Sequence, residues 1–216
     1  MKDRFYLACT RETVGSNASF HCWKGNGYST NIDMAHVYTR EEAQRAWEFG
    51  REIDLPISAD DIDALTVLHV DHQYVPGETT VEAGCSEYVA FVKGRWDGND
   101  LYWLCDGGLP TTDFSRATVY ATPGESNELA WIPFHTADAA KRRTFNINLL
   151  DRRRMIQGAG LKTPDHIKRY NRRQGSSGKV RWNCPNCGKI SWQYNPYDFD
   201  GCRDLRCDGW RPHHEQ

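Results

Sequence analysis

Four cysteines near the C-terminal end of the sequence constrain this chain more than any other feature. Cys184 and Cys187 are two residues apart and Gly188 follows them, so a tight turn can bring both thiolates to one ion. Cys202 and Cys207 form a second pair with four residues between them. In a reducing compartment, clustered cysteines favour a metal over disulfides. The spacing therefore predicts one tetrahedral metal site with four thiolate ligands.

The two pairs, separated by fourteen residues, resemble a zinc ribbon, in which a short β-hairpin joins two metal-binding turns. The resemblance implies one structural Zn²⁺, because four thiolates leave no open position for water. The four-residue spacing of the second pair departs from the usual two, and His213 or His214 could replace a ligand. A ribbon of about 35 residues has too small a core to fold alone, so the metal is expected to supply most of its stability.

Several aromatic residues accompany these cysteines, and two roles are open to them. Trp182 and Trp192 are expected to form the small core of the ribbon. Exposed rings beside basic residues would instead suit stacking on bases, because every base has a π-face.

The net charge of the 216-residue chain is only −2, but the charges are strongly segregated. Residues 1–137 carry a net charge of −11, residues 138–181 carry +10 and residues 182–216 carry −1. Basic clusters bind phosphates by releasing counterions, so we expect nucleic-acid contacts. The candidates are Arg152, Arg153, Arg154, Lys168, Arg169, Arg172, Arg173, Lys179, Arg181 and Lys189, together with Lys141, Arg142 and Arg143. Pairing of this segment with the acidic body is the alternative.

A helix is predicted inside the basic segment. Thr163 can cap it, Pro164 suits the first helical position, and the Asp165 carboxylate would lie near the positive end of the helix dipole. The helix is expected to end near Arg173, and residues 174–179 read as a flexible linker.

The acidic body contains two similar stretches. Residues 6–38 align without gaps to residues 88–120, with 8 identities in 33 positions. Each copy predicts two strands around a Gly/Asn turn and a short third strand ending in Val-Tyr. The first two strands are expected at 5–9 and 18–23, and at 88–92 and 101–105. Capping boxes at Thr39 and Thr122 then predict a helix in each copy. Each copy is small, so the two are expected to share a core.

The predicted fold class is therefore α+β, with two tandem small antiparallel-sheet/helix repeats, a basic helical linker and a C-terminal zinc ribbon. The expected boundaries are 1–80 for the first repeat, 81–150 for the second, 151–179 for the basic helix and linker, and 180–216 for the ribbon.

The stretch GYSTNIDMAHVYTREEAQ, residues 27–44, resembles a motif of short accessory proteins encoded by tailed bacteriophages. The second repeat departs from this motif at Leu109-Pro110 and Pro123-Gly124. The resemblance implies a phage or prophage origin and a bacterial host cytoplasm, but it carries no established chemistry. Neither a secretory leader nor a membrane span is expected.

Motifs for catalysis are weak. No P-loop, Gly-x-Ser-x-Gly or His-Glu-x-x-His sequence occurs, and no small-molecule substrate is indicated. His69, Asp71 and His72 suggest a metal-dependent nuclease only faintly, since His72 would point away from the other two in a strand, and a polar loop is expected instead. The remaining cysteines are expected to be core thiols: Cys9, Cys22, Cys85 and Cys105.

These observations predict a non-enzymatic, zinc-binding accessory protein of bacteriophage type that binds nucleic acid or a nucleic-acid-processing complex. The alternative is an inhibitor of a bacterial host protein, such as an anti-restriction or anti-CRISPR factor. Its acidic N-terminal body would then dock on a basic surface of the host protein.

Overall fold

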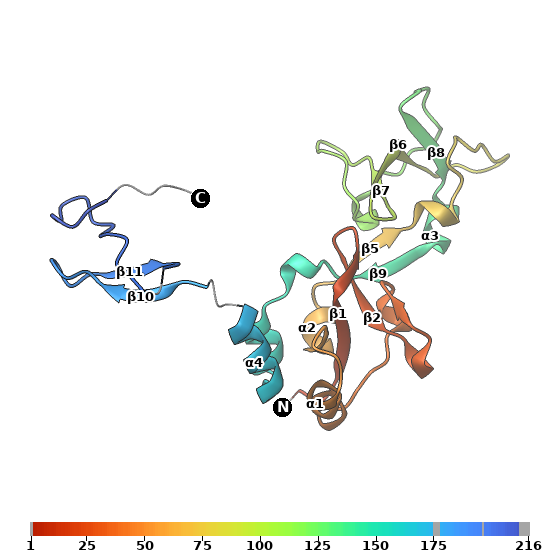
Figure 1. Ribbon diagram of the computed structural model, residues 1–216. Coiled ribbons are helices and arrows are strands. Elements are labelled where there is room, and N and C mark those ends of the chain that lie inside the picture. The colour runs from red at the N-terminus through yellow and green to blue at the C-terminus, as the bar shows by residue number, and fades with distance from the viewer. Residues whose placement is uncertain (1, 175–177, 196, 212–216) are drawn as a thin grey trace. The chain divides into compact units, whose positions relative to one another are not determined.

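The computed structural model describes residues 2–174, 178–195 and 197–211. The chain divides into two compact units, Met1–Pro164 and Asp165–Gln216, with the boundary inside the predicted 151–179 segment. The predicted α+β class is confirmed, because the strands form several small antiparallel sheets accompanied by few helices (Figure 1). Among the described helices, none has the length and apolar character needed to cross a bilayer.

The first lobe of the first unit is built on a four-stranded antiparallel sheet with the order β3-β2-β1-β4. Its elements are β1 (Phe5–Val14), β2 (Asn17–His21), β3 (Tyr28–Ser29), α1 (Arg40–Phe49), β4 (Asp54–Ser58) and α2 (Ala59–Asp63). Helix α1 begins at the predicted capping box: the Thr39 hydroxyl accepts from the Glu42 N–H, and the Glu42 carboxylate accepts from the Thr39 N–H. Trp47 on the inner face of α1 is buried.

The second lobe has a three-stranded antiparallel sheet with the order β7-β6-β8. Its elements are β6 (Tyr88–Asp97), β7 (Asp100–Trp103), β8 (Leu129–Pro133) and α3 (Phe134–Ala139). The helix predicted from Thr122 is wrong, because residues 121–128 are irregular. A Cβ at Gly124 would lie 2.6 Å from the Trp131 ring, so this segment packs on Trp131 in a way that only glycine allows. Here tertiary packing overrides the local capping signal.

The two lobes pair their strands in the same pattern. Ala8 lies opposite Phe20 in the first hairpin, and Phe91 lies opposite Trp103 in the second. These hairpin positions are 83 residues apart, whereas Tyr38 and Tyr120, which bridge to the opening strands, are 82 apart. The gap-free sequence alignment is therefore one residue out of register in the hairpins. In place of the short third strand predicted to end in Val-Tyr in each copy, the structure has only isolated bridges at Tyr38 and Tyr120.

Two strands connect the lobes (Figure 1). Strand β5 (Val67–Val70) follows the first lobe, β9 (Lys141–Thr144) follows the second, and the two pair in antiparallel fashion. Val70 is buried in the core of the second lobe, whereas Phe145 packs edge-on against Phe20 of the first. Val70 of β5 thus packs into the lobe that follows it, and Phe145, the residue after β9, packs back against the first lobe.

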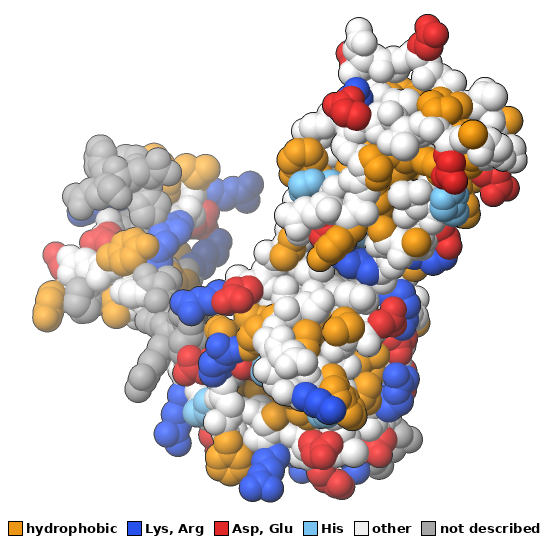
Figure 2. Space-filling model, turned by 90° about the vertical axis from the view of Figure 1, so that its right-hand side faces the viewer, with side chains coloured by type: hydrophobic (Ala, Val, Ile, Leu, Met, Phe, Trp, Pro, Cys, Tyr) orange, Lys and Arg blue, Asp and Glu red, His pale blue; other side chains and the backbone are white. Residues whose placement is uncertain are grey.

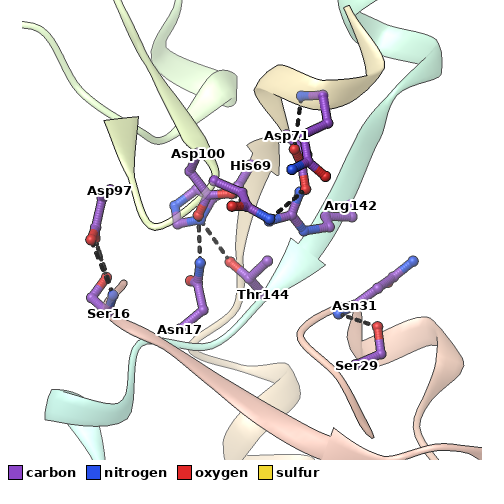
Figure 3. A network of polar contacts seen from close by, with 12 residues as sticks. Ser16, Asn17, Ser29, Asn31, His69, Asp71, Asp97, Asp100, Arg142 and Thr144 are labelled. Atoms are coloured by element: carbon purple, nitrogen blue, oxygen red, sulfur yellow. Dashed lines mark hydrogen bonds and ion pairs between the residues drawn. The ribbon is translucent and has the colours of Figure 1, made fainter. Parts of the chain in front are cut away.

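A buried polar network lies where β5 and β9 pass between the lobes (Figure 3). Asp100 is fully buried; it accepts hydrogen bonds from Asn17 and Arg142, and its carboxylate contacts His69 Nδ1. Arg142 also lies 3.3 Å from the buried Asp71 carboxylate. The polar-loop expectation is wrong for His69, which lies in β5 and is only 3% exposed. These charges are compensated inside the protein, as buried charges must be.

The second unit contains α4 (Asp165–Gln174) and a hairpin of β10 (Val180–Asn183) and β11 (Ile190–Gln193). The helix predicted from residues 163–165 is confirmed as α4. Residues 175–177 of the predicted linker lie outside the described part of the chain. The described 3₁₀ turns are Trp23–Gly25, Ile32–Met34, His72–Tyr74, Phe114–Arg116 and Ile147–Leu149, and a π-type turn spans Arg153–Gln157.

Candidate metal centre

The first cysteine pair lies in a tight turn between β10 and β11. The Gly188 N–H donates to the Cys184 carbonyl and the Cys184 N–H donates to the Lys189 carbonyl, both at 2.8 Å. Gly188 has φ 73°, a left-handed conformation that favours glycine. This turn directs the Cys184 and Cys187 sulfurs to the same side of the hairpin end.

The second pair lies in a longer turn that accommodates the four intervening residues. The Cys207 N–H donates to the Asp204 carbonyl at 2.9 Å, and the Cys202 N–H donates to the Gly209 carbonyl at 2.8 Å. Backbone N–H groups also point at the sulfurs: that of Asp204 at Cys202 Sγ and that of Gly209 at Cys207 Sγ, both at 3.4 Å. Such donors stabilise thiolates, as a metal-binding turn requires.

The four sulfurs converge on one point. Cys184 Sγ lies 3.7 Å from Cys207 Sγ, and Cys187 Sγ lies 3.6 Å from Cys202 Sγ. All four ligand atoms lie within 4.8 Å of one another. A tetrahedron with metal–sulfur bonds of about 2.3 Å has edges of about 3.8 Å. The cluster can therefore hold one metal ion. The proposed substitutes His213 and His214 lie outside the described residues.

The acidity of the thiols shows why a cation belongs between them. Burial opposes ionisation of Cys184, but the N–H groups of Cys187 and Asn186 lower the pKa of this thiol to about 7. The Gly209 N–H favours the Cys207 thiolate, yet burial and the neighbouring thiols raise the pKa of Cys207 to about 12. The first proton leaves readily, whereas the last requires a positive ion to offset the accumulated charge.

Within the described residues, these four cysteines are the only group of three or more His, Cys, Asp or Glu side chains placed to share a metal. His69 and Asp71 are held by the buried network, and His72 stacks on Trp96 with ring centroids 4.4 Å apart. The three side chains therefore have separate partners. Of the other cysteines, Cys9 and Cys22 are buried as expected, whereas Cys85 and Cys105 are only half-buried.

No family model matches this chain, and neither a curated protein nor a solved structure matches it. The bacteriophage resemblance and the duplication therefore stay predictions from the sequence.

One face of the β10–β11 hairpin is open. Arg181 lies opposite Trp192, and Asn183 lies opposite Ile190; all four side chains are exposed, and Trp192 is 51% exposed. We call these four residues the open face. The core position expected for Trp192 is wrong. Trp182 lies on the other face, half-buried, with its ring 6.1 Å from that of Phe199.

The strand alternation carries a signal for the open face that the sequence reasoning missed. Neighbouring residues in a strand point to opposite sides of the sheet. Because Arg181 lies opposite Trp192, its neighbour Trp182 must lie on the reverse side. Once the hairpin register is known, the alternation of side chains along each strand places Trp182 and Trp192 on opposite faces. The spacing of the cysteines alone does not fix that register.

The predicted basic contacts fall into several environments. In the second unit Arg169, Arg172 and Arg181 are exposed, whereas Lys168 and Lys189 form ion pairs with Asp165 and Asp204. Lys179 lies over the Tyr194 ring, 5.1 Å from its centroid. Arg152 and Arg153 are exposed on the first unit, and Arg154 lies 3.4 Å from the Asp61 carboxylate. The side chain of Arg173 lies outside the described residues.

The alternative predicted for the basic segment is that its side chains pair with the acidic body. Two arginines of β9 do so. Arg142 contacts Asp71 and Asp100, and Arg143 contacts Asp33 and Asp63, all of which belong to residues 1–137. Lys141 instead pairs with Asp138 of the basic segment itself. Figure 2 accordingly shows acidic and basic side chains interspersed on one face of the first unit. Arg142, Arg143 and Arg154 are thus neutralised by carboxylates of the acidic part.

Proposed function

We propose that the four cysteines hold one structural Zn²⁺ and that the second unit uses the resulting ribbon to bind single-stranded nucleic acid. Zinc is the ion that best suits four thiolates in a closed tetrahedral set. The ion would fix the two turns that end the hairpin, and its coordination sphere would be filled by protein ligands. The binding function then rests on the surface of the ribbon.

The observation that carries this proposal is the exposure of Trp192 next to Arg181 on the open face. An exposed ring suits a base, because stacking contributes about 1–3 kcal/mol per base with little regard for sequence. The Arg203 guanidinium donates to the Trp192 backbone carbonyl at 2.9 Å, so a further cation lies close to the β11 backbone.

Helix α4 offers further phosphate contacts within the same unit. Arg169 and Arg172 are exposed on it, and Lys168 lies one residue before Arg169. Each phosphate that a cation neutralises releases counterions, so affinity should fall steeply with salt. The acidic first unit would repel nucleic acid and restrict binding to the second. A protein of bacteriophage type acting in the bacterial cytoplasm would meet such single strands during replication or transcription.

The test is binding of the full-length protein to a fluorescein-labelled single-stranded oligonucleotide, as DNA and as RNA, followed by fluorescence anisotropy. Trp192→Ala should weaken binding by about 5- to 150-fold, the loss of one stacked base. Arg181→Ala should weaken binding and reduce its salt dependence. Leu205→Ala is the matched control, because Leu205 is 77% exposed in the same unit but outside the open face.

Two results would count against the proposal: no binding at low salt, or equal binding by Trp192→Ala and the wild type. In either case, the inhibitor alternative would be favoured if the acidic first unit captured one bacterial host protein and if nuclease treatment did not abolish this capture. A matching inhibition assay on that host protein would then replace the oligonucleotide assay.

A further inference from the structure

We propose that a cleft on the first lobe binds a small anionic ligand with a planar ring, of which a nucleoside monophosphate is the simplest example. A cleft of 640 Å³ is lined by α1 and by residues of β1, β2 and β4, and a hollow of 330 Å³ adjoins it. The two share His21, His36 and Tyr38 in their linings. This volume is within the range typical of small-molecule sites.

The carboxylates that line the cleft are already engaged by the protein. Asp54 accepts from the Tyr28 hydroxyl at 3.1 Å and from Arg51 Nε at 2.9 Å, and it lies 3.2 Å from His21 Nε2. Glu42 accepts from the N–H of Thr39 at 2.9 Å and from its hydroxyl at 3.0 Å. The buried Asp54 carboxylate is thus engaged at both oxygens, and the exposed Glu42 carboxylate is engaged at one, which leaves nitrogen groups of the cleft to face a ligand.

Two nitrogen-bearing side chains of the cleft lack partners among the described residues. Arg45 projects from α1 at the rim, exposed and without an ion pair among the described residues. His36 Nδ1 is buried and has no hydrogen-bond partner in the described part of the chain. Buried polar groups of this kind normally have a partner, which a ligand could supply. Arg45 and Lys24 line the two hollows as cations, and an anion would pair with them, while the His36 imidazole can donate to it when Nδ1 carries a proton.

The rings of His36 and Tyr38 line both hollows, and Trp23 packs against His36 just outside the lining. The His36 ring lies 4.4 Å from that of Tyr38 and 5.2 Å from that of Trp23, and Trp23 is 56% exposed. Lys24 follows Trp23 with φ 57°, the only left-handed residue other than glycine among those described. Backbone strain of this kind is often kept at ligand sites. Exposed rings beside a cation suit a planar anionic group.

The second lobe shows that the fold does not need this polar set. In the first lobe the His36 N–H donates to the His21 carbonyl at 2.8 Å. In the second lobe the same bond runs from Thr118 to Leu104 at 2.9 Å. Asp54 lies opposite β1 where Leu129 lies opposite β6. The first lobe therefore carries two imidazoles and a carboxylate at three positions. At the equivalent positions the second lobe has two leucines and a threonine.

The experiment is isothermal titration calorimetry of the full-length protein with AMP and UMP, and with adenosine and inorganic phosphate as the separate components. A monophosphate should bind with a Kd below about 1 mM, and each component should bind far more weakly. Arg45→Ala should weaken binding about tenfold or more, the loss of a charged hydrogen bond. Arg11→Ala, an exposed arginine on β1, should leave binding unchanged.

A double variant, His21→Leu with His36→Thr, gives the first lobe the residues of the second and should abolish binding. Should it fail to fold, Arg45→Ala decides, since this exposed side chain lacks an ion pair. The proposal is overturned if neither monophosphate binds, if phosphate or adenosine alone accounts for all binding, or if Arg45→Ala binds as the wild type does. Trp192→Ala should leave this site intact, which separates it from the ribbon.

Discussion

The two units of this chain are stabilised in different ways. The first unit buries large side chains in both lobes, among them Phe5, Phe20, Trp103 and Phe145. In the described part of the second unit the buried apolar side chains are Ile167, Cys184 and Cys202. Two of these three belong to the cysteine cluster. From this comparison we expect the first unit to fold on its core, and we propose that the second depends on an ion bound by the four cysteines.

Loss of one cysteine should have the largest effect and should affect one unit alone. Cys184→Ser removes a thiolate from the cluster, and structural zinc typically contributes about 10–16 kcal/mol to the folding of small zinc modules. Hydrogen exchange followed by mass spectrometry should show lost protection in residues 178–211 and unchanged protection in β1 and β6. Cys85→Ser, a half-buried cysteine of the first unit, is the control. Wild-type protection of the hairpin in Cys184→Ser would contradict the comparison.

The buried network should matter most within the first unit. Arg142→Met leaves the Asp71 and Asp100 carboxylates buried beside an uncharged side chain, at a cost of about 3–5 kcal/mol. Arg143→Met removes a neighbouring arginine whose side chain is 35% exposed, and should cost about 1 kcal/mol or less. Urea unfolding followed by far-UV circular dichroism measures both. Equal effects of the two substitutions would show that burial of the network contributes nothing.

The capping box of α1 should contribute less than the network. Thr39→Ala removes the hydroxyl that accepts from the Glu42 N–H, and should cost about 1 kcal/mol. Thr39→Ser keeps an acceptor at the same place and should retain most of the stability. Urea unfolding of the two variants against the wild type is the measurement, and an equal loss in both would assign the effect to the lost methyl group.

The surface ion pair of the ribbon should have the smallest effect. Lys189 and Asp204 form a contact between the two cysteine turns, but the Lys189 side chain is 65% exposed. Exposed pairs contribute about 0–1 kcal/mol. Lys189→Ala should therefore leave the metal-loaded second unit folded at room temperature, as judged by hydrogen exchange. A collapse like that expected for Cys184→Ser would mean that the ion pair, and not the cluster, holds the turns together.

Features set by local chemistry could be predicted from the sequence. The capping box fixes the start of α1 because both of its partners lie within four residues. The Thr163-Pro164-Asp165 signal places α4 for the same reason. The cysteine turn is also local, since Gly188 supplies the left-handed conformation that the turn requires.

Features set by distant contacts could not be predicted. The second capping box fails because Gly124 packs on Trp131, a contact that no local pattern records. The pairing of β5 with β9 joins residues more than 70 positions apart, and Val70 and Phe145 pack on opposite lobes. The cleft combines His21, His36 and Asp54, whose separation in sequence matches no known motif spacing.

The most direct measurement is metal content combined with metal removal. Protein purified without chelator should contain one zinc per chain by elemental analysis. A chelator should then abolish hydrogen-exchange protection in residues 178–211 and leave β1 and β6 protected, and added Zn²⁺ should restore the ribbon. Absence of stoichiometric metal, or a β10–β11 hairpin that stays protected after the metal has been stripped, would contradict the account.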